Sequence, residues 1–211
     1  MINSKKVWWL FPLIFIIGIV ADQILKFYIK LNFTLGEELV VFDWFRLLFI
    51  ENPGMAFGVT LGSKLFLTIF RLVVAALVVW YIVKLVKMEY KTGYLVIITL
   101  ILAGAVGNII DCLFYGLIFT ESTFDTVAQL VPFGSGYATC LTGKVVDMFY
   151  CPLFVFPDWV PFLGGEIFFS PIFNLADSYI TVSIFWLIIG YRKAFSQSLD
   201  MVMPKKNEKK D

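Results

Sequence analysis

Four long apolar runs dominate the hydropathy pattern of this 211-residue chain. A helix needs roughly 20 apolar residues to cross a bilayer, and each run is close to that length or exceeds it. The pattern therefore predicts an all-α polytopic membrane protein with four transmembrane helices. The predicted spans are residues 7–28, 65–83, 94–119 and 172–191. Residues 1–194 would form a single membrane-embedded domain, and residues 195–211 a charged tail.

The first run follows Lys5 and Lys6, as the apolar segment of a signal peptide would. It is longer than such a segment usually is, and no small-x-small cleavage site follows it. We therefore expect it to remain in the protein as a helix.

Two connecting segments carry structure of their own. Within residues 29–64, the run 39–50 (LVVFDWFRLLFI) is rich in β-branched and aromatic residues, which predicts one or two strands. Asn52-Pro53-Gly54 then predicts a turn. We expect these strands to form a small amphipathic sheet that rests on the membrane surface. Residues 120–171 form a second, longer loop that contains several glycines and prolines.

Composition indicates a membrane protein, and the distribution of charge predicts its orientation in the membrane. The chain is 60% hydrophobic and its mean hydropathy is +0.86, far above that of a soluble domain. Eleven of its 17 Lys and Arg residues lie before the first span, between the second and third, or after the fourth. The positive-inside rule makes these regions cytoplasmic. Both termini should then be cytoplasmic, and the loops 29–64 and 120–171 extracytoplasmic.

Three carboxylates interrupt the apolar runs at a common depth. Asp22, Asp111 and Asp177 each lie about one third of the way in from the outer end of a span, roughly 10 Å below the outer surface. Ionised groups at that depth are costly and mark functional sites. Asn108 and Asn174 each precede one of these acids by three residues, so each shares the face of its acid. The pattern predicts a shared site near the outer face.

The residue types of the chain allow few kinds of catalysis. The chain has no His and three scattered Cys, which excludes a Ser-His or Cys-His nucleophile and the common zinc sites. Two aspartates about 3 Å apart share one proton, so that one activates water while the other polarises a carbonyl. We expect such a pair, with no metal and no cofactor. The intramembrane positions favour Asp111 with Asp177. A small proton-coupled transporter or channel subunit is the alternative, because proton relays also use intramembrane acids.

Five sequence blocks contain most of the polar residues of the predicted site: Ala21-Asp22-Gln23 with Lys26; Glu51-Asn52-Pro53-Gly54-Met55-Ala56-Phe57-Gly58; Gly104-Ala105-Val106-Gly107-Asn108-Ile109-Ile110-Asp111; Val145-Val146-Asp147-Met148; and Phe173-Asn174-Leu175-Ala176-Asp177-Ser178. Together, and in this order, they resemble the lipoprotein signal peptidases (signal peptidase II). The resemblance implies four transmembrane helices and a small extracytoplasmic β-sheet cradle. It also implies an aspartyl endopeptidase of the bacterial cytoplasmic membrane that removes signal peptides from lipid-modified prolipoproteins, just before the lipidated Cys.

The resemblance reassigns the catalytic pair to Asp147 and Asp177, with Asp125 and Asp158 as alternative partners. Asp111 then becomes a supporting residue. The supporting or substrate-binding positions that match the family are Asp22, Lys26, Asn52, Gly54, Gly107, Asn108, Asp111, Asn174 and Ala176. We expect lipid-modified prolipoproteins and membrane lipids as partners, no nucleic acid, and a monomer.

The chain departs from the family in two ways. Cys112 stands where the family usually has Arg, and Arg71 in the second span is the candidate substitute. The intervals on either side of Asp147 are also longer than usual. The extra residues include many aromatic side chains, which would form a lid or an interfacial anchor. Cys140 and Cys151 share the same outer loop, and whether they pair is open.

Overall fold

The bundle contains three helices long and apolar enough to cross a membrane, among the residues described by this computed structural model (6–56, 59–60 and 64–203). They are α1 (Leu10–Asn32), α2 (Lys64–Lys87) and the continuous run Thr92–Ile118. That run comprises α3 (Thr92–Ile110), the π-helical turn η1 (Asp111–Tyr115) and the short α4 (Gly116–Ile118). The fourth apolar helix, α5 (Leu175–Gly190), is shorter.

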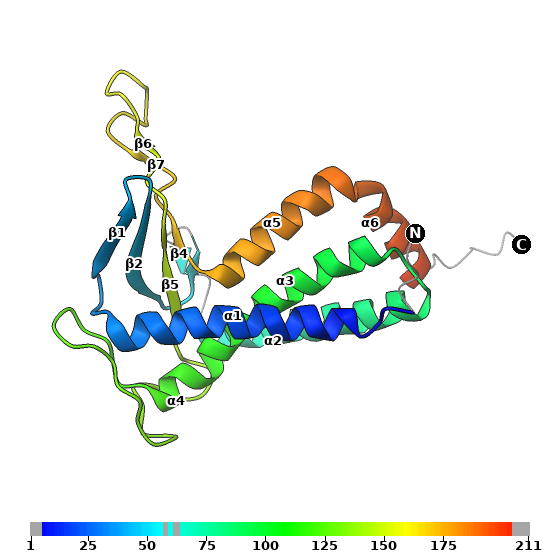
Figure 1. Cartoon of the computed structure of the whole chain (residues 1–211), viewed down its shortest axis with the longest axis horizontal. Coiled ribbons are helices and arrows are strands. Elements are labelled where there is room, and N and C mark those ends of the chain that lie inside the picture. Colours follow the sequence, from blue (N-terminus) through cyan, green and yellow to red (C-terminus); the bar gives the residue numbers. More distant parts are fainter. Residues whose placement is uncertain (1–5, 57–58, 61–63, 204–211) are drawn as a thin grey trace, which may run out of the picture.

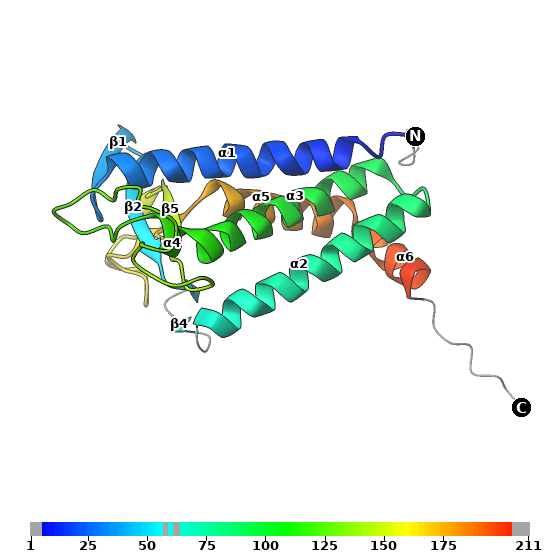
Figure 2. The same ribbon diagram turned by 90° about the horizontal axis from the view of Figure 1, so that it is seen from below.

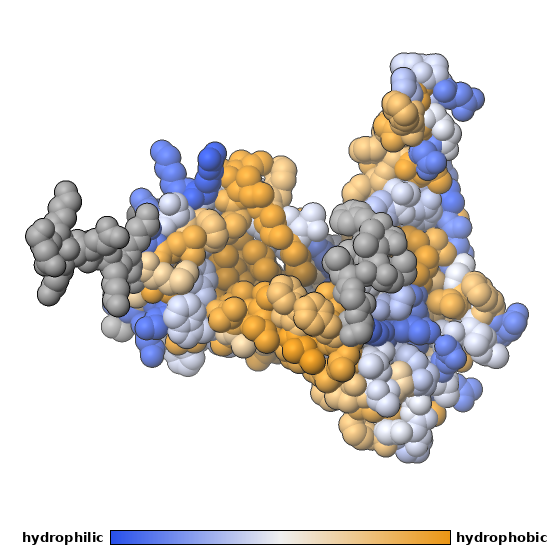
Figure 3. Space-filling view, turned by 180° about the vertical axis from the view of Figure 1, so that it is seen from behind, coloured by the Kyte–Doolittle hydropathy of each residue, from blue (hydrophilic) through white to orange (hydrophobic). Residues whose placement is uncertain are grey.

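Helix α3 is the centre of the bundle, since α1, α2 and α5 all pack against it (Figures 1 and 2). Glycines permit the closest approaches. A Cβ atom on Gly104 would clash with the carbonyl oxygen of Ala176, and one on Gly107 would lie 2.7 Å from Asp22 Oδ2. The outward faces of the helices are apolar, and Figure 3 shows a broad apolar surface over them.

A four-stranded antiparallel sheet lies at one end of the bundle, so the expected all-α class is too simple (Figure 1). Its order is β1-β2-β5-β8, with bounds β1 Glu38–Phe42, β2 Phe45–Asn52, β5 Val145–Tyr150 and β8 Ile172–Phe173. The strands predicted within 39–50 are confirmed as β1 and β2. Strands β5 and β8 come from the second loop and from the start of the expected fourth span, and the local pattern did not predict them.

Two smaller pairs of strands flank this sheet. Strands β3 (Met55–Ala56) and β4 (Val59–Thr60) pair with each other; Phe57 and Gly58 of the second family block lie outside the described residues. Strands β6 (Phe154–Val155) and β7 (Ile167–Phe168) form an antiparallel hairpin that projects from the sheet (Figure 1).

The opposite end of the bundle is closed by helix α6 (Arg192–Val202), whose Ala194 and Ser198 are buried. Tyr90 donates to the carbonyl oxygen of Ala194 (2.6 Å), and the hydroxyl groups of Tyr81 and Tyr94 both bond to Ser198. Part of the segment that we expected to be a charged tail is therefore a packed helix. Residues 204–211 lie outside the described residues.

Candidate active site

Two aspartates from different elements meet around one asparagine. Asp147 lies on β5, and Asp177 lies in the first turn of α5. Asn174 caps α5: its Oδ1 accepts from the backbone N–H of Asp177 (2.9 Å), and its own backbone N–H donates to Asp177 Oδ2 (3.4 Å). The Nδ2 of Asn174 donates to Asp147 Oδ1 at 2.7 Å. A single residue thus starts the helix and links both carboxylates.

Two further amides orient the pair. Asn108 donates to Asp177 Oδ1 (2.8 Å), while its Oδ1 accepts from Lys26 Nζ (2.8 Å). Asn52 forms a side-chain hydrogen bond with Asp147. The Oδ1 of Asn52 accepts from the backbone N–H of Gly54 (2.8 Å), which has the positive φ that glycine favours. Each carboxylate is therefore held by neutral donors rather than by a directly bonded cation.

The surroundings favour a proton on Asp147. Its side chain is buried, with 4% of its surface exposed. Burial raises the pKa of Asp147 to about 7, and the charge of Asp177 acts in the same direction, whereas the hydrogen bond from Asn174 opposes the shift. At neutral pH the pair can hold one proton and one negative charge, as the proposed carboxylate chemistry requires.

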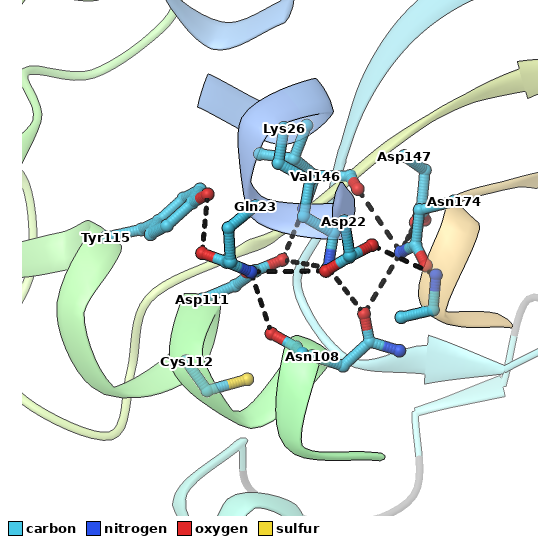
Figure 4. A network of polar contacts seen from close by, with 12 residues as sticks. Asp22, Gln23, Lys26, Asn108, Asp111, Cys112, Tyr115, Val146, Asp147 and Asn174 are labelled. Atoms are coloured by element: carbon cyan, nitrogen blue, oxygen red, sulfur yellow. Dashed lines mark hydrogen bonds and ion pairs between the residues drawn. The ribbon is translucent and has the colours of Figure 1, made fainter. Parts of the chain in front are cut away.

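A buried ion cluster lies beside Asp147 and Asn174 (Figure 4). The ammonium of Lys26 is fully buried and lies 2.9 Å from Asp22 Oδ2 and 2.8 Å from Asp111 Oδ2. Gln23 donates to Asp111 Oδ1 (2.9 Å) and accepts from the hydroxyl of Tyr115 (3.1 Å). One cation therefore pairs with two carboxylates, and the uncharged Gln23 donates a further hydrogen bond.

The two supporting acids each hold the backbone next to one of the paired aspartates. Asp22 Oδ1 accepts from the backbone N–H of Ala176 (3.0 Å), and Asp111 Oδ2 accepts from that of Val146 (3.3 Å). Ala176 and Val146 immediately precede Asp177 and Asp147 in the chain. The ion cluster thus positions both carboxylates through the main chain.

Most residues expected at the site are brought together here. The exceptions are the alternative acids Asp125 and Asp158, which are exposed in the second loop. Sequence reasoning assigned no role to Gln23, although it adjoins Asp22, or to Tyr115, although it lies four residues after Asp111. Arg71 lies on α2, and its guanidinium is 3.6 Å from the sulfur of buried Cys112.

A second buried cluster, which the sequence analysis did not predict, attaches the outer loop to the sheet. Lys30 pairs with Glu51 on β2 and donates to Ser122 (2.9 Å). Lys144 Nζ lies 3.1 Å from Glu51 Oε2. Lys30 lies one helical turn beyond Lys26, so both side chains share one face of α1. This spacing was the feature of the sequence that could have identified Lys30. Cys140 and Cys151 are both free thiols in the structure.

Comparisons with known proteins agree on one family. The family model described as signal peptidase (SPase) II matches residues 14–192. A lipoprotein signal peptidase of Porphyromonas gingivalis is 49% identical over 187 residues, covering 86% of this chain and 82% of that protein. A lipoprotein signal peptidase of Amoebophilus asiaticus is 35% identical over 204 residues, covering 92% and 82%.

Solved structures show the same fold. A bacterial membrane enzyme determined by the in meso method aligns over 100% of both chains with a TM-score of 0.64 and 24% identity. The fold and these matches define a membrane-embedded peptidase rather than the transporter or channel subunit that was the alternative. The chain belongs to the signal peptidase II family.

The ion cluster should stabilise the fold as well as the site. Replacing Lys26 with Met leaves Asp22 and Asp111 buried without their cation, which should cost about 3–5 kcal/mol. We expect Lys26→Met to lower the thermal unfolding temperature in detergent. The exposed Lys84→Met variant on α2 is the matched control and should unfold like the wild type.

A second substitution tests the cause. Adding Asp111→Asn to Lys26→Met removes one uncompensated charge, so the double variant should recover part of the lost stability. If Lys26→Met unfolds at the wild-type temperature, the cluster does not have this role.

Proposed function

We propose that this protein is an intramembrane aspartyl endopeptidase that removes the signal peptide from diacylglyceryl-modified prolipoproteins, cutting just before the lipidated Cys. Family membership supports the reaction, since the relatives are named lipoprotein signal peptidases. The observation that carries the catalytic assignment is the bonding of Asn174 to both Asp147 and Asp177.

The pair would act as a general acid and a general base. Asp177 takes a proton from a water molecule, whose oxygen bonds to the scissile carbonyl carbon. Protonated Asp147 donates to the carbonyl oxygen as it gains charge. When the tetrahedral intermediate collapses, the C–N bond breaks, the proton from Asp177 passes to the departing nitrogen, and the hydroxyl proton returns to Asp147. Neither metal nor cofactor enters these steps.

The membrane placement follows from the charges and the helices. We propose that α5 is the fourth span. Its 16 residues extend about 24 Å, less than the roughly 30 Å of hydrocarbon. The gap at its outer end is filled by the sheet, which lies at the membrane surface. The excess of Lys and Arg on the α6 side supports a topology with both termini in the cytoplasm and the aspartate pair near the outer face.

An apolar cavity offers room for the signal peptide. It has a volume of about 440 Å³ and is lined mainly by α2 and α6, with α3 and a single residue of α5 completing the wall at the α6 end of the bundle. Its lining includes Leu77, Ile98, Leu187 and Phe195. We place the apolar segment of the signal peptide along this side of the bundle. The scissile bond would then reach the N-terminus of α5, and the acyl chains would stay in lipid.

Arg71 is proposed to supply the positive charge that the family usually carries at position 112. Its guanidinium lies against Cys112, the residue after Asp111, although it comes from a different helix. Because Arg71 is half-buried and beside the site, it can orient a polar part of the substrate. Its removal should weaken substrate use without dismantling the aspartate pair.

The assignment of Arg71 has a direct test. Arg71→Gln should lower kcat/KM by about tenfold, equivalent to about 1.4 kcal/mol of lost stabilisation. Adding Cys112→Arg to Arg71→Gln should restore activity, because the charge returns to the same place from η1. Rates are measured on a lipidated precursor with purified protein. Wild-type kinetics in Arg71→Gln would remove Arg71 from the site.

The aspartate pair is tested by isosteric substitution. Asp147→Asn and Asp177→Asn should each lower the cleavage rate by roughly 10²–10⁴-fold, because each removes a general acid or base. The matched control is Asp125→Asn in the same outer loop, where the acid is exposed, and it should retain activity. Unfolding temperatures establish that each variant is folded. Full activity in Asp147→Asn would move the partner role to another acid such as Asp111.

The raised pKa of Asp147 predicts two pH effects. Activity should fall as pH rises through about 7, because the acid loses its proton. Stability should fall in the same direction. Between the ordinary aspartate pKa of 3.8 and about 7, the folded state keeps a proton that the unfolded state has lost, so the unfolding free energy decreases as pH rises.

Unfolding temperatures measured across this pH range check the second effect. The maximum slope for one group is about 1.4 kcal/mol per pH unit. Asp147→Asn should flatten the slope between pH 4 and pH 7, since it cannot titrate, whereas Asp125→Asn should keep the wild-type profile. An unchanged slope in Asp147→Asn would show that Asp147 does not retain the proton.

A further inference from the structure

The hairpin formed by residues 151–171 presents large apolar side chains that no other part of the described structure covers. At its tip, Trp159 is 80% exposed and Phe162 is fully exposed. Leu153, Val155 and Leu163 are also exposed. An exposed cluster of this kind is typical of a surface that contacts another apolar phase.

The hairpin has a defined shape of its own. The rings of Phe154 and Phe168 stack with centroids 4.8 Å apart, and Phe156 packs edge-on against both. Phe156 and Gly165 bond through their backbones (2.9 Å). Phe162 is held at a φ of 64°, a left-handed conformation that a bulky residue rarely adopts. The fold therefore holds an aromatic side chain outward at a conformational cost.

The direction of the hairpin relates it to the bilayer. The sheet lies at the outer end of the helices, and the hairpin runs from it across the bundle axis, beyond α5 (Figure 1). The outward face of α5 is apolar, with Val182, Phe185 and Trp186 exposed. Lipid beside α5 would therefore lie directly beneath the hairpin. Figure 3 shows a mainly apolar surface on the edge of this projection that faces the helices, with hydrophilic surface on the opposite edge.

We propose that the 151–171 hairpin is a membrane anchor whose tip, carrying Trp159 and Phe162, inserts into the interfacial region of the outer leaflet beside α5. This inference rests on the membrane placement of the helices and not on the peptidase reaction. Aromatic side chains are favoured at that depth. The rings of Phe42 and Trp44 in the β1–β2 turn are also exposed and stack on each other.

The charge of the hairpin specifies the kind of lipid contact. Residues 151–171 contain no Lys or Arg, and their two charged side chains are Asp158 and Glu166. Attraction to anionic headgroups therefore cannot hold the tip. The anchor should insert into a zwitterionic bilayer, and added salt should not release it.

The anchor would fix the depth of the active site relative to the outer surface of the membrane. One strand of the hairpin follows β5, which carries Asp147, and the other leads into β8 and then to Asn174 and Asp177. A fixed tip therefore restrains both carboxylates from the same side. A scissile bond close to a lipid-anchored Cys lies at a fixed depth, so the active site must be held at that depth.

Spin labelling in nanodiscs of phosphatidylcholine tests the proposal with the intact protein. In a Cys140→Ser, Cys151→Ser background, where Cys112 is buried, a nitroxide is attached at Phe162→Cys. Collisions with oxygen, which concentrates in lipid, are compared with collisions with a water-soluble nickel chelate. We expect oxygen to dominate at position 162 and the balance to stay the same in high salt.

Two further labels serve as references. Val73→Cys on the exposed face of α2 reports lipid, and Ser135→Cys in the outer loop reports water. Nickel access at position 162 equal to that at 135 would overturn the proposal. Protection from both reagents would also overturn it, because it would indicate contact with protein, such as a second copy. A label at Val73 exposed to nickel would instead contradict the placement of the helices.

Discussion

The buried ammonium of Lys26 is the interaction on which the site depends. It lies between Asp22 and Asp111, and these two acids accept from the backbone N–H groups of Ala176 in α5 and Val146 in β5. Helices α1 and α3, the N-terminus of α5 and strand β5 therefore meet at one charge. A buried cation is stable only with such partners, because its desolvation is expensive. Because Lys26 can stay buried only with these partners in place, their positions relative to one another are closely fixed.

Hydropathy predicted the apolar helices well but not where they end. Helix α1 continues to Asn32 rather than to residue 28, because the buried Lys30 finds Glu51 and Ser122 as partners. Helix α5 begins at Leu175 rather than at 172, because Asn174 caps it. Residues 172 and 173 pair instead with β5. Each difference arises from a contact distant in sequence, which a local apolar count cannot detect.

The depth of the acids predicted most residues of the candidate site, whereas the pair Asp147 and Asp177 was predicted only by the family resemblance. The common depth of Asp22, Asp111 and Asp177 along the spans correctly predicted that they lie in one region. It also favoured a pair between Asp111 and Asp177, whereas the structure bonds Asp111 to Lys26 and links Asp147 to Asp177 through Asn174. The position of Asp147 depends on strand β5 adding to β2, and that pairing joins residues about 100 apart in the chain.

The π-helical turn at Asp111–Tyr115 rotates the side chains that follow it about the axis of the third span, relative to a continuous α-helix. Such a turn contains one residue more than a turn of α-helix, because its hydrogen bonds join residues i and i+5. Before it, α3 directs Gly107 and Asn108 toward α1 and α5. At its end and after it, Tyr115 and Phe119 pack with the end of α1 and with the sheet. Loss of a single residue here would turn the two halves by about 100° relative to each other. This stretch of the chain therefore tolerates substitution more readily than any change in its length.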